Sequence, residues 1–265
     1  MKNLDIYCVT DKKLDFLEKT NLKLVGVGKE KFSEKYLKCD TKKNIYHKEK
    51  YYSELAFHYW YWQNILPNEK QDWIGFCQKR RFWINPEKDQ NLITPENLNE
   101  FLLSEIDDKL SKSESFICSP VNLTGVKKMK MIKRGWKNLI KDPNIFFNNQ
   151  KHTIALHFDM HHGYNNLNKA INLLDSENKR DFFDFVNNKT YFNPHIMCIS
   201  RPDILEKWFK SLFSWLERCE SEFGFNNLKG YDTQRLYAYL AERYLSYWFQ
   251  KYTKFREIPW TVIQI

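Results

Sequence analysis

The distribution of apolar and polar residues predicts strands that alternate with helices in the first half of the chain. Short apolar runs over residues 4–9, 23–28 and 73–77 have the length and composition of buried strands. Between the last two runs, large apolar residues recur every three or four positions over 51–66, and Pro67 ends this predicted helix. This order of elements indicates a β-α-β arrangement and a mainly parallel sheet.

The later part of the chain is richer in predicted helices. Thr94 and Pro95 indicate a helix start, and a strand is expected over 115–120. The segment 121–150 is highly charged and is predicted to be irregular. Helices are expected over 166–174, 179–186, 202–222 and 232–252, and strands over 191–200 and 258–265. We therefore predict one α/β domain over residues 1–265 that becomes helix-rich after residue 120.

Composition adds a preference for anionic partners. The 265 residues include 42 Lys and Arg against 33 Asp and Glu, and the net charge of +9 suits phosphates, nucleic acid or an acidic membrane surface. An aromatic content of 17% fits stacking or sugar-binding surfaces as well as an aromatic core. The six cysteines show no CxxC spacing, which favours buried thiols in a reducing compartment. No signal peptide or membrane-spanning run is evident, so a cytoplasmic protein is expected.

The strongest local signal is the run Lys79-Arg80-Arg81, directly after the predicted strand 73–77. In open α/β sheets, ligands bind outside the carboxyl ends of the strands. Arginines there can bind a diphosphate through paired hydrogen bonds. The alternative is a solvated strand exit with ordinary surface charge. Glycine-rich nucleotide loops, zinc motifs and GxSxG are absent from the sequence, so the standard sites of those kinds are not expected.

Two further groups carry candidate chemistry. In "HFDMHH", a helix would place His157 and His161 one turn apart, as in a metal pair, and His162 beside them. Lining of an anion or sugar site, or partial burial, explains these histidines equally well. In "GYDTQRLYAYLAER", Asp232 at a helix start is either an N-cap or a general base, and Glu242 is a second candidate base.

Blocks along almost the whole chain carry a resemblance to a known family. A strand like "IYCVTDKK" opens the chain, and a Tyr-x-Glu-Leu helix with a later Tyr-Trp-x-Trp-x-Asn occupies 52–64. The exit Ile-Gly followed by Arg-Arg occupies 74–81. The remaining blocks are Asp40, Asn44-Ile45, His157-Phe158, His162, "FNPHIMCIS", Gln234-Arg235 and Leu240-Ala241-Glu242-Arg243. In these blocks the chain resembles a bacterial glycosyltransferase family, long labelled a domain of unknown function, from capsular-polysaccharide and O-antigen clusters.

The resemblance implies a GT-A-like sheet and transfer of a sugar, of hexosyltransferase type, from a nucleotide sugar, with a UDP-linked donor expected. It implies a nucleotide-sugar half over 1–120, an acceptor-side half over 121–265, and a saccharide or lipid-linked acceptor. Galactofuranose-type donors also belong to the family and are not carried over. The implied donor-binding residues are Thr10, Asp40, Asn44, Glu54, Gln78, Lys79, Arg80, Arg81, His157 and His162, and the implied catalytic residues are Asp232, Glu242 and His195.

The chain departs from the family pattern at two places. Gln78-Lys79 replaces a His-Tyr pair, and Asn166-Leu167-Asn168 replaces an Asp-Leu-Asp, which puts the donor or acceptor in doubt. The Asp-x-Asp that usually holds a metal in such folds is also missing after the strand, where the cations of 79–81 stand. We therefore assign no metal ligand and leave a requirement for Mg²⁺ or Mn²⁺ open. The hypothesis is that these cations neutralise the leaving diphosphate.

The basic segment 127–137 leaves several interpretations open. A nucleic-acid-binding protein without catalytic activity is the competing class, because this segment combines cations with aromatic residues. No RNA- or DNA-binding signature supports that class, so a nucleic-acid partner is not expected. For a glycosyltransferase, the same segment is either a loop that closes over the donor or a patch that touches anionic lipid of the inner membrane.

Overall fold

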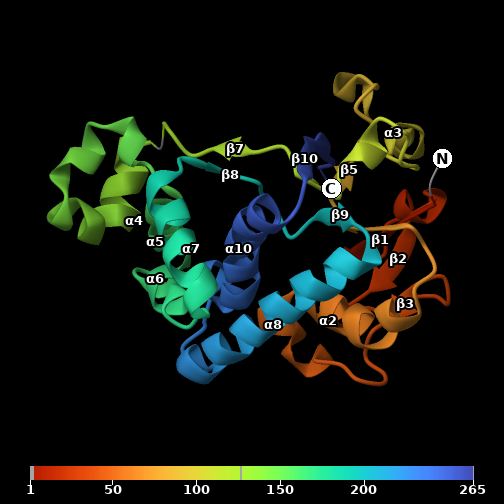
Figure 1. The fold of residues 1–265 in the computed structure, drawn as a ribbon, viewed down its shortest axis with the longest axis horizontal. Helices are drawn as coiled ribbons and strands as arrows, with labels where there is room; N and C mark the ends of the chain where they lie inside the picture. Colours follow the sequence, from red (N-terminus) through yellow and green to blue (C-terminus); the bar gives the residue numbers. More distant parts are fainter. Residues whose placement is uncertain (1–2, 126, 265) are drawn as a thin grey trace. The chain divides into compact units, whose positions relative to one another are not determined.

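The computed structural model describes residues 3–125 and 127–264, drawn in Figure 1. The chain forms two compact units. The first unit consists of Met1–Ser119, His195–Ser211 and Phe249–Ile265, and the second of Pro120–Pro194 and Leu212–Trp248. Each unit is described by itself.

The first unit is built on a twisted sheet whose strands run mainly in one direction. The order along the sheet is β10-β6-β9-β4-β1-β2-β3, and only β9 runs opposite to the other six strands of this path. β5 and β11 extend it through antiparallel pairs. Mainly parallel strands with flanking helices confirm the predicted α/β class. The strands are β1 Leu4–Thr10, β2 Lys23–Gly26, β3 Leu37–Lys38, β4 Trp73–Gln78, β5 Arg81–Trp83, β6 Ser115–Cys118, β9 Cys198–Ser200, β10 Phe255–Ile258 and β11 Trp260–Val262.

The strand register brings several chain exits to one edge of the sheet. Val9 of β1 pairs with Gln78 of β4, and Thr10 pairs with Gly26 of β2, so these three strands end side by side. Because β9 is antiparallel to its neighbours, the residues that precede it, including His195, lie at this same edge. This is the edge at which ligands bind in open α/β sheets.

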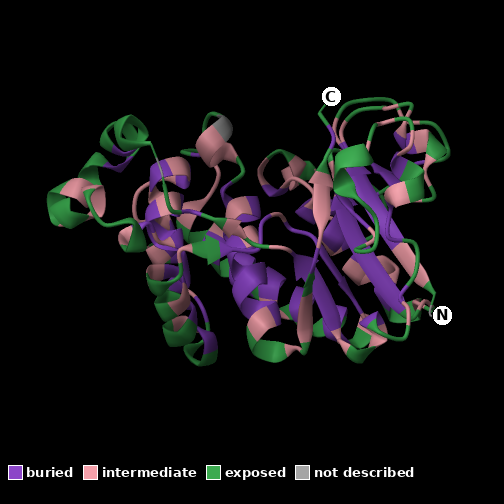
Figure 2. Ribbon diagram, turned by 90° about the horizontal axis from the view of Figure 1, so that it is seen from above, coloured by how far each residue is buried: buried purple, intermediate pink, exposed green. Residues whose placement is uncertain are grey.

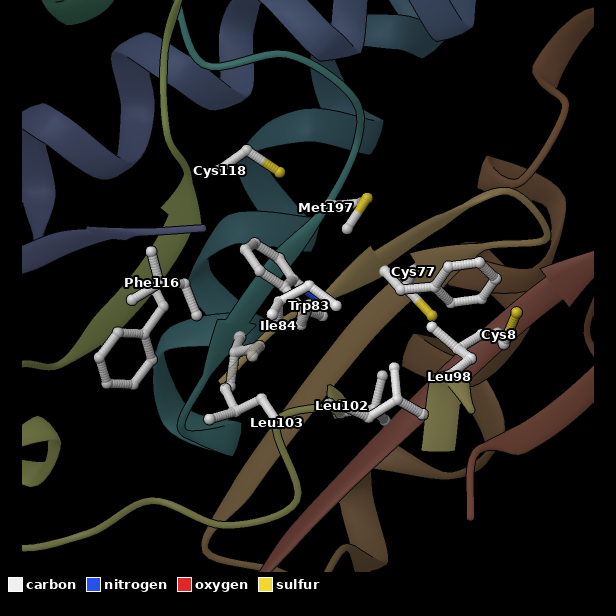
Figure 3. Packing of buried hydrophobic residues seen from close by; sticks show 14 of the residues in the cluster. Cys8, Cys77, Trp83, Ile84, Leu98, Leu102, Leu103, Phe116, Cys118 and Met197 are labelled. Atoms are coloured by element: carbon white, nitrogen blue, oxygen red, sulfur yellow. The ribbon is translucent and has the colours of Figure 1, made fainter. Parts of the chain in front are cut away.

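Apolar side chains from both ends of the sequence fill the core of the first unit. The central strands β1, β4, β6 and β9 are buried through most of their length (Figure 2). Figure 3 shows Cys77, Trp83, Phe116 and Met197 packed together with neighbouring leucines. The Trp83 indole Nε1 donates to the Phe76 carbonyl at 2.9 Å, which satisfies its one polar group. All six cysteines lie in the described residues, are buried and form no disulfide.

Among the described residues, the α-helices that lie wholly within the first unit are α1 Glu49–Tyr52, α2 Leu55–Asn64 and α3 Leu98–Phe101. The single helix predicted over 51–66 is wrong, because Ser53 adopts a left-handed φ of 53° that separates α1 from α2. The helix predicted from Thr94 is only one turn long. Its continuation is extended, because the Leu103 amide donates to the Trp83 carbonyl at 3.1 Å and Leu102 forms a bridge with Ile84.

In its described residues, the second unit is mainly helical and contains one small pair of strands, β7 Val121–Asn122 and β8 Tyr191–Phe192. Helices α8 and α10 each continue from one unit into the other. Within the described residues, no helix is both long and apolar enough to cross a membrane. The helices are α4 Lys128–Lys141, α5 Ile154–His162, α6 Asn166–Ile171, α7 Ser176–Asn188, α8 Pro202–Phe223, α9 Tyr231–Gln234 and α10 Leu236–Tyr252.

Three predictions for this part of the chain are wrong in detail. The segment expected to be irregular contains α4, whose Met131 and Gly135 are buried, with Gly135 against Met160 of α5. The strand predicted over 191–200 is two strands that belong to different units. The helix predicted over 232–252 is interrupted at Arg235, where α9 ends and α10 begins.

Candidate functional site

The cations of 79–81 lie on a tight hairpin at the carboxyl edge of the sheet. Gln78 of β4 pairs with Arg81 of β5, so Lys79 and Arg80 form the turn between them. The hairpin is held from both sides, because the Lys79 amide donates to the Val9 carbonyl at 3.0 Å and the Arg80 carbonyl accepts from the Ile263 amide at 2.9 Å. The backbone of this turn is therefore fixed before any ligand binds.

The three cations are held differently. The Lys79 ammonium contacts the Asp11 carboxylate, and Arg80 is exposed at the tip of the turn. One terminal nitrogen of Arg81 donates to Gln78 Oε1 at 3.0 Å. Arg81 Nε is buried and has no hydrogen-bond partner among the described residues. A buried donor without a partner calls for an explanation, and a bound anion would supply one.

Glu54 completes a polar chain with the hairpin. Its carboxylate accepts a hydrogen bond from Gln78 Nε2, while Gln78 Oε1 accepts from Arg81. Glu54 stands at the start of α2, directly after the left-handed Ser53. A non-glycine residue in that conformation is strained, and such strain is common at functional sites. We call the group Asp11, Glu54, Gln78, Lys79, Arg80 and Arg81 the sheet-edge site.

Thr10, Asp40 and Asn44 shape the backbone around this site. The Thr10 hydroxyl donates to the Lys12 carbonyl at 2.5 Å and accepts from the Lys12 amide at 3.1 Å, which fixes the exit of β1. Asn44 Nδ2 donates to the Asp40 and Lys42 carbonyls, at 3.2 and 2.9 Å, and its Oδ1 accepts from the Tyr46 amide at 3.0 Å. Asn44 thus organises the loop after β3, on which the side chain of Asp40 is exposed.

His195 lies at the same edge of the first unit, three residues before β9. Its φ of 69° is left-handed, a rare conformation for a residue with a side chain. Its ring packs edge-on against Trp260 of β11, with 4.6 Å between the ring centroids. β11, which pairs with β5, therefore places the Trp260 ring against this histidine.

In the second unit, a buried arginine contacts His157 and Glu242. Arg243 is only 1% exposed, and its guanidinium contacts the Glu242 carboxylate and lies 3.3 Å from His157 Nδ1. It also lies over the Phe192 ring at 4.0 Å. His162 stacks on Tyr239 at 3.6 Å between centroids. We call His157, His162, Tyr239, Glu242 and Arg243 the histidine–arginine cluster.

The environment keeps the clustered histidines neutral. Burial, reinforced by the charge of Arg243, lowers the pKa of His157 to about 2 and that of His162 to about 3. His162 Nδ1 lies 3.0 Å from the Asp232 carbonyl oxygen and so acts as the donor there. The Asp232 carboxylate pairs with Arg134 at 3.0 Å. Both predicted carboxylate bases thus already contact an arginine.

The helical prediction for "HFDMHH" is confirmed by α5, but its metal interpretation gains no support. His157 and His161 do stack one turn apart, with 4.4 Å between ring centroids. His157 Nδ1 faces Arg243, and His161 Nδ1 faces the His157 carbonyl at 2.8 Å. Throughout the described part of the chain, no group of three or more His, Cys, Asp or Glu side chains could hold a metal ion.

The predicted site residues thus fall into two groups. Thr10, Glu54, Gln78, Lys79, Arg80, Arg81 and His195 gather at the sheet edge with the loop of Asp40 and Asn44, while His157, His162, Asp232 and Glu242 belong to the second unit. Sequence reasoning missed Asp11, Trp260 and Tyr239. Asp11 had a signal, because it directly follows β1 at the carboxyl edge. Trp260 and Tyr239 had none beyond being aromatic.

The fold and the sheet-edge site define a class of α/β proteins whose polar residues gather at the strand exits. The family described as a domain of unknown function (DUF4422) matches residues 5–254, and the chain belongs to that family. No curated protein matches the chain. The apo structure of the WbbM bifunctional glycosyltransferase is similar over 99% of this chain, with a TM-score of 0.69 and 18% sequence identity. This chain covers 46% of that protein, so it spans about half of its length.

Proposed function

We propose that this chain transfers a sugar from a nucleotide-sugar donor to a saccharide or lipid-linked acceptor during synthesis of a bacterial surface polysaccharide. One observation carries the proposal. A rigid hairpin presents Lys79, Arg80 and Arg81 at the carboxyl edge of the sheet, and the buried Arg81 Nε has no partner within the described residues. The similarity of the fold to a bifunctional glycosyltransferase supports this proposal. The first version of this proposal to test is a hexosyltransferase that uses a UDP-linked sugar donor.

In this proposal, the hairpin binds the diphosphate of the donor. Charge develops on the nucleoside diphosphate as the bond to the sugar breaks, and fixed cations stabilise that charge most when they need not rearrange. Gln78 helps to orient Arg81, and Glu54 orients Gln78 in turn. Lys79 contacts Asp11, so part of its charge is already balanced.

Two carboxylates at the edge already have partners other than a metal. Asp11 contacts Lys79, Glu54 contacts Gln78, and the described residues offer no group of three or more metal-ligating side chains. Mg²⁺ prefers near-octahedral oxygen ligands, often one or two carboxylates with the substrate phosphates. We therefore propose that Lys79, Arg80 and Arg81 supply the diphosphate charge neutralisation.

The general base is proposed among His195, Asp232 and Glu242. A base must reach the acceptor hydroxyl within hydrogen-bond distance. His195 shares the sheet edge with the hairpin, whereas Asp232 and Glu242 each contact an arginine in the second unit. A His195→Gln variant that retains donor binding and loses transfer would identify His195. Unchanged turnover would exclude His195 and leave Asp232 or Glu242 as the general base.

The proposal is tested by thermal unfolding with a panel of nucleoside diphosphates and nucleotide sugars, with added Mg²⁺ or Mn²⁺ or with a chelator. A ligand that binds only the folded state raises the melting temperature. We expect one nucleotide series to raise it, in the chelator as well. A shift that requires the metal would contradict the cation role. If oligonucleotides alone raise the melting temperature, the transferase proposal fails in favour of nucleic-acid binding.

A further inference from the structure

Helix α4 exposes an unusual amount of apolar surface. Trp136 is 52% exposed and Ile140 is 72% exposed, although both lie within a regular helix. Of the eleven large hydrophobic residues exposed in the described part of the chain, five lie between positions 129 and 147. They are Met129, Ile132, Trp136, Ile140 and Phe147, and we call the four on the helix the α4 apolar row.

The α4 apolar row is not the face by which the helix packs on its own unit. At about 100° per residue, Met129, Trp136 and Ile140 fall within one narrow stripe, with Ile132 beside it. Met131 and Gly135 lie on the adjoining side of the helix, and both are buried. Gly135 lies so close to α5 that an added Cβ would meet Met160 at 3.3 Å. The helix thus has one apolar side that packs and a second that is exposed.

Cations border the exposed side. The helix carries six Lys and Arg residues and no Asp or Glu. Lys133 and Lys137 follow the apolar row around the helix, and the Lys137 ammonium lies 5.6 Å from the centroid of the Trp136 ring. Arg134, further round, pairs with Asp232. A row of Trp, Ile and Met bordered by lysines is the pattern of helices that lie in the plane of a lipid–water interface.

We propose that the α4 apolar row, with Lys133 and Lys137, docks this protein onto an anionic lipid bilayer. The apolar side chains would enter the boundary between headgroups and acyl chains, while the lysines meet lipid phosphates. A second copy of the chain fits less well, because it would bring two sets of uncompensated cations together. Nucleic acid also fits less well, because it would cover aliphatic Ile and Met with phosphate and ribose. This inference does not rest on the proposed sugar transfer.

The test is flotation of the full chain with two kinds of vesicle, one of phosphatidylcholine alone and one containing phosphatidylglycerol. We expect binding to the anionic vesicles, weakened by salt because lysine–phosphate attraction is screened. The double variant Trp136→Ser/Ile140→Ser should lower the partition coefficient at least about tenfold, because two large side chains leave the interface. Lys133→Glu/Lys137→Glu should remove the preference for anionic vesicles.

Matched controls are available elsewhere on the surface. Leu92→Ser removes a side chain that is 62% exposed, and Lys207→Glu/Lys210→Glu reverses two exposed charges on α8. Both controls should float like the unaltered chain, and every variant should keep its melting temperature. The proposal is overturned if the unaltered chain does not bind anionic vesicles, or if the α4 variants bind as well as the controls. Loss of a dimer or of oligonucleotide binding in the α4 variants, without vesicle binding, would assign this surface to that partner instead.

Discussion

Two regions of this protein gather cations and carboxylates, and the two regions treat charge differently. In the histidine–arginine cluster, Arg243 is 1% exposed and is surrounded by Glu242, His157 and the Phe192 ring. In the sheet-edge site, Arg80 is exposed and the buried Nε of Arg81 has no partner among the described residues. The buried Nε of Arg243 also lacks a partner among the described residues, so the contrast lies in exposure. The first region encloses its arginine with a carboxylate and a histidine, and the second leaves Arg80 open to another molecule.

This contrast shows why a charged motif cannot be assigned from residue types alone. A buried charge is tolerated only when it is paired, so its partners are mainly structural. A charge at a strand exit keeps much of its hydration and can exchange that water for a ligand. We therefore expect changes in the cluster to act mainly on the free energy of unfolding, and changes at the sheet edge to act mainly on ligand affinity.

The largest effect is expected from Arg243→Met. Removing the buried guanidinium takes an ion-pair partner from Glu242 and a polar contact from His157, which should lower the free energy of unfolding by about 3–5 kcal/mol. Urea denaturation measures this loss. Arg235→Met, on an exposed side chain, should change it by less than about 0.5 kcal/mol. The double variant Arg243→Met/Glu242→Gln should recover part of the loss, and a stable single variant would contradict the structural role.

The next effect concerns affinity. Arg81→Met should weaken binding of the stabilising nucleoside diphosphate by about 1.5–3 kcal/mol, the contribution of a charged hydrogen bond, which is roughly tenfold to a hundredfold in Kd. Titration calorimetry measures the change. The free energy of unfolding should stay within about 1 kcal/mol of the unaltered value, because within the described residues the side chain makes one hydrogen bond, to Gln78. Equal losses of stability and affinity in Arg81→Met would contradict the expectation that changes at the sheet edge act mainly on ligand affinity.

The pH dependence of the free energy of unfolding tests the structural role of the histidine–arginine cluster. The pKa of His157 is lowered by burial to about 2, below its ordinary value of 6.5, so unfolding takes up a proton below pH 6.5. Its contribution to stability is complete above that pH and is lost as the pH falls toward 2, by up to about 1.4 kcal/mol per pH unit.

Chemical denaturation at pH 7, 6 and 5 measures this loss. His157→Gln should reduce the change of the free energy of unfolding with pH by the contribution of one histidine. The glutamine oxygen can still accept a hydrogen bond from Arg243. His47→Gln serves as the control, because His47 is exposed. His58 is buried against Phe76 in the first unit, and burial lowers its pKa to about 3. His58 therefore also contributes to the loss of stability as the pH falls. An unchanged slope in His157→Gln would mean that His157 is not held neutral in the folded protein.

The smallest effect is expected from Arg80→Ala. This side chain is exposed at the turn, where a contact with a diphosphate competes with water and salt, so the loss of affinity should be at most about 1 kcal/mol. Raising the salt concentration should remove this difference while leaving most of the Arg81 effect. A loss from Arg80→Ala that exceeds the loss from Arg81→Met would reverse the assignment of the principal phosphate donor.

Local pattern was enough for the strands and the main helices. The apolar runs of β1, β4 and β6 are buried on both faces, which makes them continuous and easy to recognise. The abrupt change from apolar to basic residues after β4 led to the hairpin cations, and the rule for strand exits placed them. Asp232 and Glu242 were found as candidate bases from their helix positions, and the family resemblance added His195. Helix α4 was missed because its charge density resembles that of a loop, although its apolar residues recur at helical spacing.

By itself, the sequence determined an α/β chain with a basic strand exit, buried thiols and membership of a family, because these follow from residue types and their spacing. Only the tertiary structure decided what each charge meets. Arg81 faces Gln78, Arg243 is enclosed with Glu242, and Trp136 is exposed on a helix that already packs through its other apolar side. Such pairings join residues from different elements, and long-range packing sets them rather than local periodicity.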